Sequence, residues 1–383
     1  MTRRRSALVW TLVILAGVLA LVSSLTVWSR QQLLDTNKFT SSSAKLLANP
    51  EIRSTLSTRL VDALSQRVDV QSQLEARLPP RAKGAAPAIA AAIENSTAQV
   101  INAFLATAKA QQLWEQVIRR AHGALVNVLE GKNAGPISTA NGNVVLDLAP
   151  FLQQIAQRLG VGDRLKQHVP AGSGQIVLLK SDQLSAAQTG VKILKALSSW
   201  LAFAVVALLA LAIYLAHPRR RMMLEVAGFT LLTVGVILLI VRRFVGNAIV
   251  DSLVKVESSK PAVHAVWAIE TDLLRDLALA LVLYGVVALL AGFVAGPSRI
   301  AVALRRWLAP VWREHPVVVW LVAGFVFLLV IAFGPAAGSR RLLGVVVLAA
   351  LVALGLEVWR RQTLREFPDG HEEAPAPAAA ASP

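Results

Sequence analysis

The stretch SALVWTLVILAGVLALVSSLTVWS occupies residues 6–29 and contains no charged side chain. A helix needs roughly 20 apolar residues to cross a bilayer, so this stretch is long enough to span one. Three arginines at residues 3–5 precede it and no small-residue cleavage site follows. The pattern therefore predicts a retained signal anchor rather than a cleaved signal peptide.

Five further uncharged runs follow, at Ala196–Ala216, Val226–Val241, Leu277–Ser298, Pro316–Ser339 and Leu342–Leu356. The second and fifth of these are short, and they need charged residues at the interfaces, where long side chains can reach water. We expect the corresponding spans at 198–216, 224–243, 277–296, 316–334 and 341–358. Together with a mean hydropathy of +0.55, the runs indicate a multi-pass membrane protein.

A polar segment, residues 29–197, separates the first two runs and is long enough to bury a core of its own. It holds 19 lysines and arginines against 11 aspartates and glutamates, a net charge of +8. The predicted fold class is mainly α, with a six-helix transmembrane bundle. Between the first two spans we expect a largely helical extracytoplasmic domain that carries a small β-hairpin or sheet.

The expected domains follow from these runs. They are residues 1–28 (cytoplasmic tail and signal anchor), 29–197 (exported domain), 198–359 (membrane domain with an outer helical connection at 247–276) and 360–383 (cytoplasmic tail with a disordered Ala/Pro-rich end).

Arginine placement predicts the orientation, because short cytoplasmic connections carry an excess of basic residues. If the N-terminus is cytoplasmic, the inner segments hold thirteen arginines and the short outer connections hold seven lysines and arginines. We therefore expect a plasma-membrane protein with both termini in the cytoplasm and residues 29–197 outside.

Local signals predict the helices of the polar segment. Asn49, Pro50 and Glu51 form a helix start, with a cap, a proline at the first position and an acid in the first turn. An apolar stripe runs from Leu113 to Val128 and ends at Gly131. A third, shorter helix is expected near 152–160. Residues 82–92 read either as a linker or as the start of a helix.

Other signals mark strands and connections. Asn141-Gly142 lies between short β-prone runs and predicts a hairpin, and residues 175–180 read as another strand. Ser181 and Asp182 begin the helix that enters the second span. Ser259 and Pro261 begin a helix predicted to continue into the fourth span and to stand against the exported domain.

Sequence motifs for chemistry are weak. Cysteine is absent, so there is no thiol nucleophile and no thiolate ligand. His122 and His168 lack a second ligand at metal-binding spacing, so we expect both to be solvated or at helix ends. We expect no enzymatic activity, no catalytic, cofactor-binding or metal-binding residues, and no cofactor. The net charge of +16 is not gathered with aromatics on one face, which argues against nucleic acid.

Two pairs of residues are candidate sites. Arg242 and Arg243 stand at the outer end of the third run, where they are candidates for ion pairs with Glu257, Glu270 or Asp272, for contact with lipid phosphate, or for simple helix-end snorkelling. Gly292 and Gly296 form a GxxxG pattern that permits close helix packing, within the monomer or at a dimer seam.

The segment that follows the first run carries a resemblance. Trp28 is followed after five residues by Leu34-Asp35-Thr36, and Leu46–Pro50, Asn143–Pro150 and Trp267–Gly296 continue the pattern. In these features the chain resembles a family of uncharacterised integral membrane proteins of actinobacteria. The resemblance implies a plasma-membrane location with one exported domain, and it implies no activity, substrate or site residue.

The expected function is that of a non-enzymatic cell-envelope protein. Its basic exported domain would bind a protein partner or an anionic envelope component, and its membrane helices would contact lipid and anchor the domain. The alternative is a transporter or lipid-handling protein. No ionisable residue lies at the centre of any run, as proton-coupled transport would require, and this favours the first reading.

Overall fold

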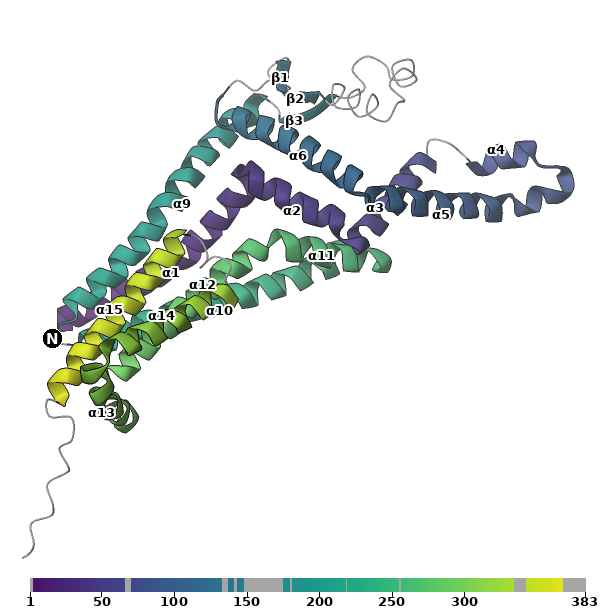
Figure 1. Ribbon diagram of the computed structural model, residues 1–383. Helices are drawn as coiled ribbons and strands as arrows, with labels where there is room; N and C mark the ends of the chain where they lie inside the picture. Colours follow the sequence, from purple (N-terminus) through teal and green to yellow (C-terminus); the bar gives the residue numbers. More distant parts are fainter. Residues whose placement is uncertain are drawn as a thin grey trace, which may run out of the picture. The chain divides into compact units, whose positions relative to one another are not determined.

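The computed structural model describes residues 3–65, 70–132, 137–140, 143–147, 175–179, 181–217, 219–254, 256–333 and 342–367 (Figure 1). The chain divides into two compact units. The membrane unit comprises Met1–Leu25, Ser199–Arg242 and Leu273–Pro383. The second unit comprises Thr26–Ser198 and Arg243–Asp272.

Four helices are long and apolar enough to cross a membrane: α1 (Arg3–Leu34), α9 (Ser181–Leu215), α10 (Arg220–Leu253) and α12 (Asp272–Val294). Among the described residues a fifth span is obtained when α13 (Arg299–Glu314) and α14 (Pro316–Phe333), which meet at a bend of 114°, are counted as one bent span. The last helix is α15 (Leu342–Glu366). The chain is a multi-pass membrane protein.

The fold class expected from the sequence is therefore wrong. The described residues hold four spans, or five with the bent pair, in place of a six-helix bundle. Hydropathy alone treated residues 299–334 as a loop followed by a straight span. The amphipathic pattern of α13 instead makes a second helix, which turns sharply into α14 at His315. The described chain is helical apart from three short strands.

The first three spans are much longer than a bilayer core. Helices α1, α9 and α10 contain 32, 35 and 34 residues. At a rise of about 1.5 Å per residue each is roughly 50 Å long, against about 30 Å of hydrocarbon. The short third run of the sequence is thus the apolar middle of a longer helix, and its flanking charges lie on further helical turns.

A seam of small residues joins α10 to α12 within the membrane unit. A Cβ atom added at Gly228 would lie 2.9 Å from the Gly285 carbonyl oxygen, and one at Gly235 would lie 2.6 Å from the Ala278 carbonyl oxygen. One added at Gly285 would lie 2.6 Å from the Leu232 nitrogen. In each case the nearest atom belongs to the backbone of the other helix, so the two helices touch only because these positions lack a side chain.

Helix α1 packs on the same unit through its buried stripe. Val9 and Val13 form a cluster with Ala212 of α9, Ala216 just after α9 and Met223 of α10. Burying such small and branched side chains supplies close packing, which is the main source of helix association in lipid.

The second unit is a set of shorter helices. They are α2 (Thr36–Ala48), α3 (Pro50–Ser65), α4 (Val70–Arg77), the 3₁₀ turn η1 (Pro80–Ala85), α5 (Ala86–Leu105) and α6 (Ala108–Leu129). The start predicted at Asn49 is confirmed, because its side-chain oxygen accepts from the amides of Glu51 and Ile52. The predicted end at Gly131 is confirmed as well, with φ of 74° just after α6. Residues 82–92 form η1 and the first turns of α5.

Packing in this unit is pairwise. Helix α2 lies on α6, while α3 and α4 both lie on α5. Helix α11 (Lys260–Glu270), preceded by the 3₁₀ turn η2 (Glu257–Ser259), packs on α3 and α2. It begins at Ser259 with Pro261 in its first turn, as predicted. It ends at Glu270, with Thr271 as its C-cap, and does not run on into α12, so that part of the prediction is wrong.

The β structure is small. Strands β1 (Ile137–Ala140) and β2 (Asn143–Asp147) pair antiparallel, and β3 (Gln175–Leu179) pairs with β2, giving the order β1-β2-β3. Helix α9 begins at Ser181, as predicted. The helix expected near 152–160, His168 and the Ala/Pro-rich end lie outside the described residues.

Candidate partner-binding surface

The two arginines proposed from sequence lie inside α10. Arg242 is partly exposed and Arg243 is exposed. Two of their expected partners lie in ion pairs with other residues, since Glu257 pairs with Lys260 at 2.6 Å and Asp272 pairs with Lys45 at 3.5 Å. The side chain of Glu270, the third candidate, accepts a hydrogen bond from the amide of Gln32.

The two glycines proposed as a packing motif hold a charged pair. The Arg221 Nε donates to the Gly292 carbonyl oxygen at 2.8 Å, and Arg221 forms a 3.1 Å ion pair with Glu225. A Cβ at Gly292 would lie 2.4 Å from Glu225 Cγ, and one at Gly296 would lie 2.4 Å from Arg221 Nη2. The pattern therefore makes room for side chains of α10 as well as for helix contact.

The C-terminal end of α12 is capped by cationic and amide groups from distant parts of the chain. Arg305, which is 1% exposed, donates to the carbonyl oxygens of Val294 and Gly296 and pairs with Glu366 at 2.7 Å. Gln362 donates to the Ala295 carbonyl oxygen at 3.2 Å. These bonds satisfy carbonyls that a helix end leaves without partners, and the arginine charge suits the negative end of the helix dipole.

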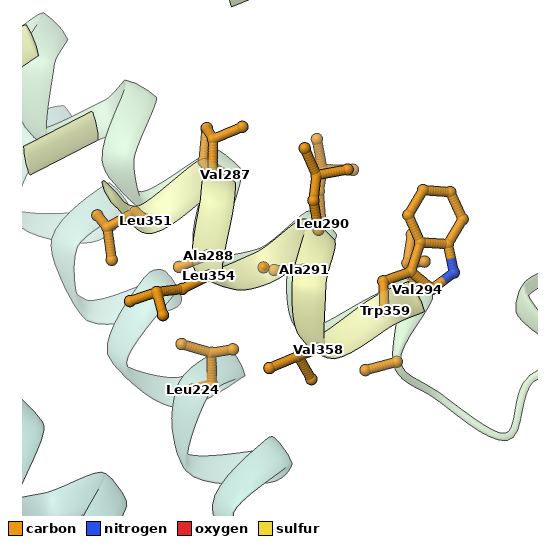
Figure 2. Close-up of a pocket in the computed structure, with 14 residues that line it drawn as sticks. Leu224, Val287, Ala288, Leu290, Ala291, Val294, Leu351, Leu354, Val358 and Trp359 are labelled. Atoms are coloured by element: carbon orange, nitrogen blue, oxygen red, sulfur yellow. The ribbon is translucent and has the colours of Figure 1, made fainter. Parts of the chain in front are cut away.

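An apolar groove of about 390 Å³ lies between α12 and α15 in the membrane unit (Figure 2). Leu290 and Val294 line it from α12, and Leu354 and Trp359 line it from α15. Its size suits a ligand, and its walls offer almost no polar group. A groove of this chemistry accommodates an acyl chain, whereas an ion or a sugar would lose its hydration there without replacement.

Polar contacts hold the parts of the second unit together. The Trp28 indole donates to the Glu270 carbonyl oxygen at 3.1 Å, and Gln32 donates to the Glu270 carboxylate. Burial raises the pKa of Glu270 above its ordinary value of 4.5. These contacts join the end of α1 to α11, far away in the sequence.

The structure corrects the expectation for His122. This residue lies within α6 and is 7% exposed, with its ring stacked on Phe39 at 4.1 Å between centroids. Its Nδ1 is 3.1 Å from the hydroxyl oxygen of Thr36. Burial lowers the pKa of His122 below 6.5, although a backbone hydrogen bond at Leu33 and the charge of Asp35 act in the opposite direction. His122 is thus a packing residue between α6 and α2.

Glu130 ties the end of α6 to α9. It forms ion pairs with Lys132 and Lys195. The hydrogen bonds from Lys132 and Lys195 lower the pKa of Glu130, so its carboxylate is charged at neutral pH. The polar residues described so far therefore hold helices together or cap a helix end.

Helix α5 differs, because it presents an apolar stripe that no other described element covers. Ile89, Ile93, Val100 and Phe104 are 36%, 43%, 69% and 44% exposed. At about 100° per residue their side chains fall within roughly 60° of one another around the helix. The neighbouring face, with Ala86 and Ala90 buried, is the one that packs within the unit. Figure 1 shows α4 alongside α5, and α3 packs on α5 as well.

Basic residues flank this stripe at both ends. Arg81 and Lys83 are exposed in η1, just before α5. Lys109 is exposed in the first turn of α6, four residues after α5 ends. We call Ile89, Ile93, Val100, Phe104 and these three basic residues the α5 surface.

Sequence reasoning missed the α5 surface, although the signal was present. The spacing of Ile89, Ile93, Val100 and Phe104 is helical and continues past the segment that was left open as a linker or a helix start. The sequence did not show which face of α5 other helices would cover. Only the packing of α3 and α4 shows which apolar residues of α5 remain outside.

The described residues contain no group of three side chains suited to hold a metal ion. No family model matches this chain, and comparison with curated proteins and with solved structures likewise gave no significant match.

Proposed function

We propose that this chain is a non-enzymatic plasma-membrane protein whose exported domain binds an acidic protein partner of the cell envelope through the α5 surface. In this proposal both termini are cytoplasmic and residues 29–197 face outward. The distribution of arginines among the connections supports that orientation. The likeness of residues 28–50 to an actinobacterial membrane-protein family supports the location.

The observation that carries the proposal is the exposure of the α5 stripe. Four large apolar side chains, up to 69% exposed at Val100, lie together on helix α5 of the second unit. Contiguous apolar patches of this kind mark interaction sites on soluble surfaces. Burying the stripe against a partner would remove its apolar area from water, at about 25 cal/mol per Å².

Charge selects the class of partner. Arg81 and Lys83 stand before the stripe and Lys109 stands after it, within a segment of net charge +8. A partner with an apolar face and acidic residues at both ends would match the stripe and its flanks. A second copy aligned antiparallel on α5 would instead bring Lys83 of one chain toward Lys109 of the other, which like-charge repulsion disfavours.

Site-specific photo-crosslinking in the native membrane tests this function. A photoreactive residue at Val100 should form one adduct, with an acidic envelope protein identified by mass spectrometry. The matched control is the same residue at Asn95, which is exposed on another side of α5 and should form no adduct. Charge reversal of Arg81, Lys83 and Lys109 should abolish the Val100 adduct.

The proposal fails if Val100 and Asn95 give the same products, if the Val100 adduct survives charge reversal, or if the adduct is a dimer of this chain. Orientation is tested separately. A single cysteine at Thr139 should react with an impermeant maleimide on intact cells, and reaction only after lysis would refute the topology.

The apolar groove between α12 and α15 favours one alternative, a lipid-handling protein. Lipid transfer would require an acyl chain to exchange through the groove. Replacing Leu354, which is 65% exposed at the groove, with tryptophan would then slow lipid exchange between vesicles. Under the leading proposal the same substitution leaves the Val100 adduct unchanged.

A further inference from the structure

Helix α13 is an amphipathic element beside the spans. It begins after Ser298, whose hydroxyl accepts from the Ala301 amide, and it ends at Glu314. It meets α14, an almost wholly apolar helix, at 114°. If α14 crosses the bilayer, α13 lies close to the membrane plane.

One face of α13 is fixed to the membrane unit. Ala301, Arg305, Ala309 and Trp312 are buried, each three or four residues from the next. Arg305 caps the end of α12, and Trp312 packs edge-on against Trp359 with ring centroids 6.2 Å apart. This face holds the helix in place, so the opposite face has a defined direction.

The opposite face is apolar and open. Ile300 and Trp307 are seven residues apart, on one side of the helix, and are 70% and 72% exposed. Two such large side chains in contact with water would be costly, whereas tryptophan is favoured at the membrane–water interface. If α14 crosses the bilayer, the bend places α13 at the depth of that interface.

A row of arginines runs beside the apolar face. Arg299, Arg306 and Arg313 are also seven residues apart and are exposed. Arg306 stacks over the Phe367 ring at 5.6 Å, and Arg313 donates to the Phe367 carbonyl oxygen. These contacts to the end of α15 orient two guanidinium groups, and each group has five N–H donors, enough to bind a phosphate as well.

We infer that α13 lies in the membrane–water interface and binds the headgroups of anionic phospholipids through Arg299, Arg306 and Arg313, with Ile300 and Trp307 inserted beneath them. Helices that combine a basic row with a tryptophan-bearing apolar face bind anionic bilayers in this way. Near an anionic membrane surface each arginine is worth about fivefold in affinity. The inference depends only on the membrane unit, and it stands or falls separately from the α5 surface.

Two measurements on the full chain test it. The first labels a cysteine at Ile300 with an environment-sensitive fluorophore in this cysteine-free chain, reconstituted into phosphatidylglycerol vesicles. We expect blue-shifted emission and quenching by a spin label at headgroup depth. The same fluorophore at Gln99 of α5 is the water-exposed control. Emission from position 300 that matches the control would overturn the interfacial placement.

The second measures lipid selectivity by native mass spectrometry of the detergent-purified protein with added phosphatidylglycerol or phosphatidylcholine. Replacing Arg299, Arg306 and Arg313 with glutamine should lower phosphatidylglycerol retention at least tenfold and leave phosphatidylcholine unchanged. A triple replacement of Lys38, Arg59 and Lys132, which are exposed in the second unit and lie outside the α5 surface, removes the same charge and should change neither.

Equal losses in the two triple variants would mean that net charge alone attracts the lipid, and would overturn headgroup binding at α13. The single variant Arg299→Gln guards against misfolding of the triple variant, because Arg299 is exposed and forms no hydrogen bond or ion pair with another side chain among the described residues. It should lower phosphatidylglycerol retention about fivefold, and an unchanged value would also refute the inference.

Discussion

Replacing Gly285 with alanine should separate α10 from α12. The added Cβ would lie 2.6 Å from the Leu232 nitrogen and 2.7 Å from the Gly228 carbonyl oxygen. Ordinary contact begins near 3.4 Å, so the helices must part by roughly 0.8 Å, and a gap of that size forfeits a quarter to a half of each dispersion contact along the seam. Overpacking of this kind costs about 1–3 kcal/mol.

Alanine also stabilises a helix relative to glycine, by about 1 kcal/mol, which offsets part of the loss. We expect a net loss of about 0–2 kcal/mol, or up to roughly 5 °C in the unfolding midpoint, and a full loss of about 1–3 kcal/mol relative to an alanine that meets no neighbour. The midpoint would be read as the fraction of monodisperse protein left after heating in detergent.

Gly324→Ala is the matched control, because nothing lies within 4 Å of a Cβ at that position. Its midpoint should stay the same or rise slightly. If the Gly285 and Gly324 variants had equal midpoints, the helices would not touch at the seam, and the account of α10–α12 packing would be refuted.

Three further outcomes follow from buried or half-buried charges. Arg305→Ala should lower the midpoint by about 5–10 °C, since losing the hydrogen bonds made by a buried charged group costs about 2–3 kcal/mol, whereas the exposed Arg365→Ala should change it little. Acidification should destabilise the protein through His122. Because the folded-state pKa of His122 is lowered, its contribution to the free energy of unfolding is full above pH 6.5 and is lost as pH falls through the folded-state pKa. An unfolding midpoint that is flat from pH 7.5 to 5 in wild type, or equally steep in His122→Asn, would contradict this. Glu270 has a raised folded-state pKa, so its contribution to the free energy of unfolding is present below pH 4.5 and is lost as pH rises. Glu270→Gln should therefore raise the unfolding midpoint at pH 7 and not at pH 4, as differential scanning fluorimetry can check.

The sequence identified the local elements better than the architecture. The cap at Asn49, the end at Gly131 and the proline start of α11 are set by side chains within one turn, and all three are where the pattern predicted. The count of spans failed at the C-terminal end, where α15 is not among the candidate spans of the described residues and α14 counts only in a bent pair with α13. That segment has the charges of a loop, and it becomes a helix through the alternation of its apolar and basic sides.

The candidate sites show the same division. Gly292 and Gly296 were recognised as small residues that allow close approach, yet the atoms that approach belong to Glu225 and Arg221, about 70 positions earlier. His122 was read from its sequence neighbours alone, and its burial comes from Phe39 and Thr36 on another helix. Periodicity identifies the faces of a helix, but it does not say which face a distant element will cover.

The cap on α12 has a consequence for how the protein is made. Arg305 follows the carbonyls that end this span by about ten residues, whereas Gln362 and Glu366 are added only after some 60 further residues have been translated. Until then the end of α12 depends on water, lipid headgroups or an insertase for its hydrogen bonds. A chain that stops before residue 362 would leave the Ala295 carbonyl oxygen without the hydrogen bond from Gln362.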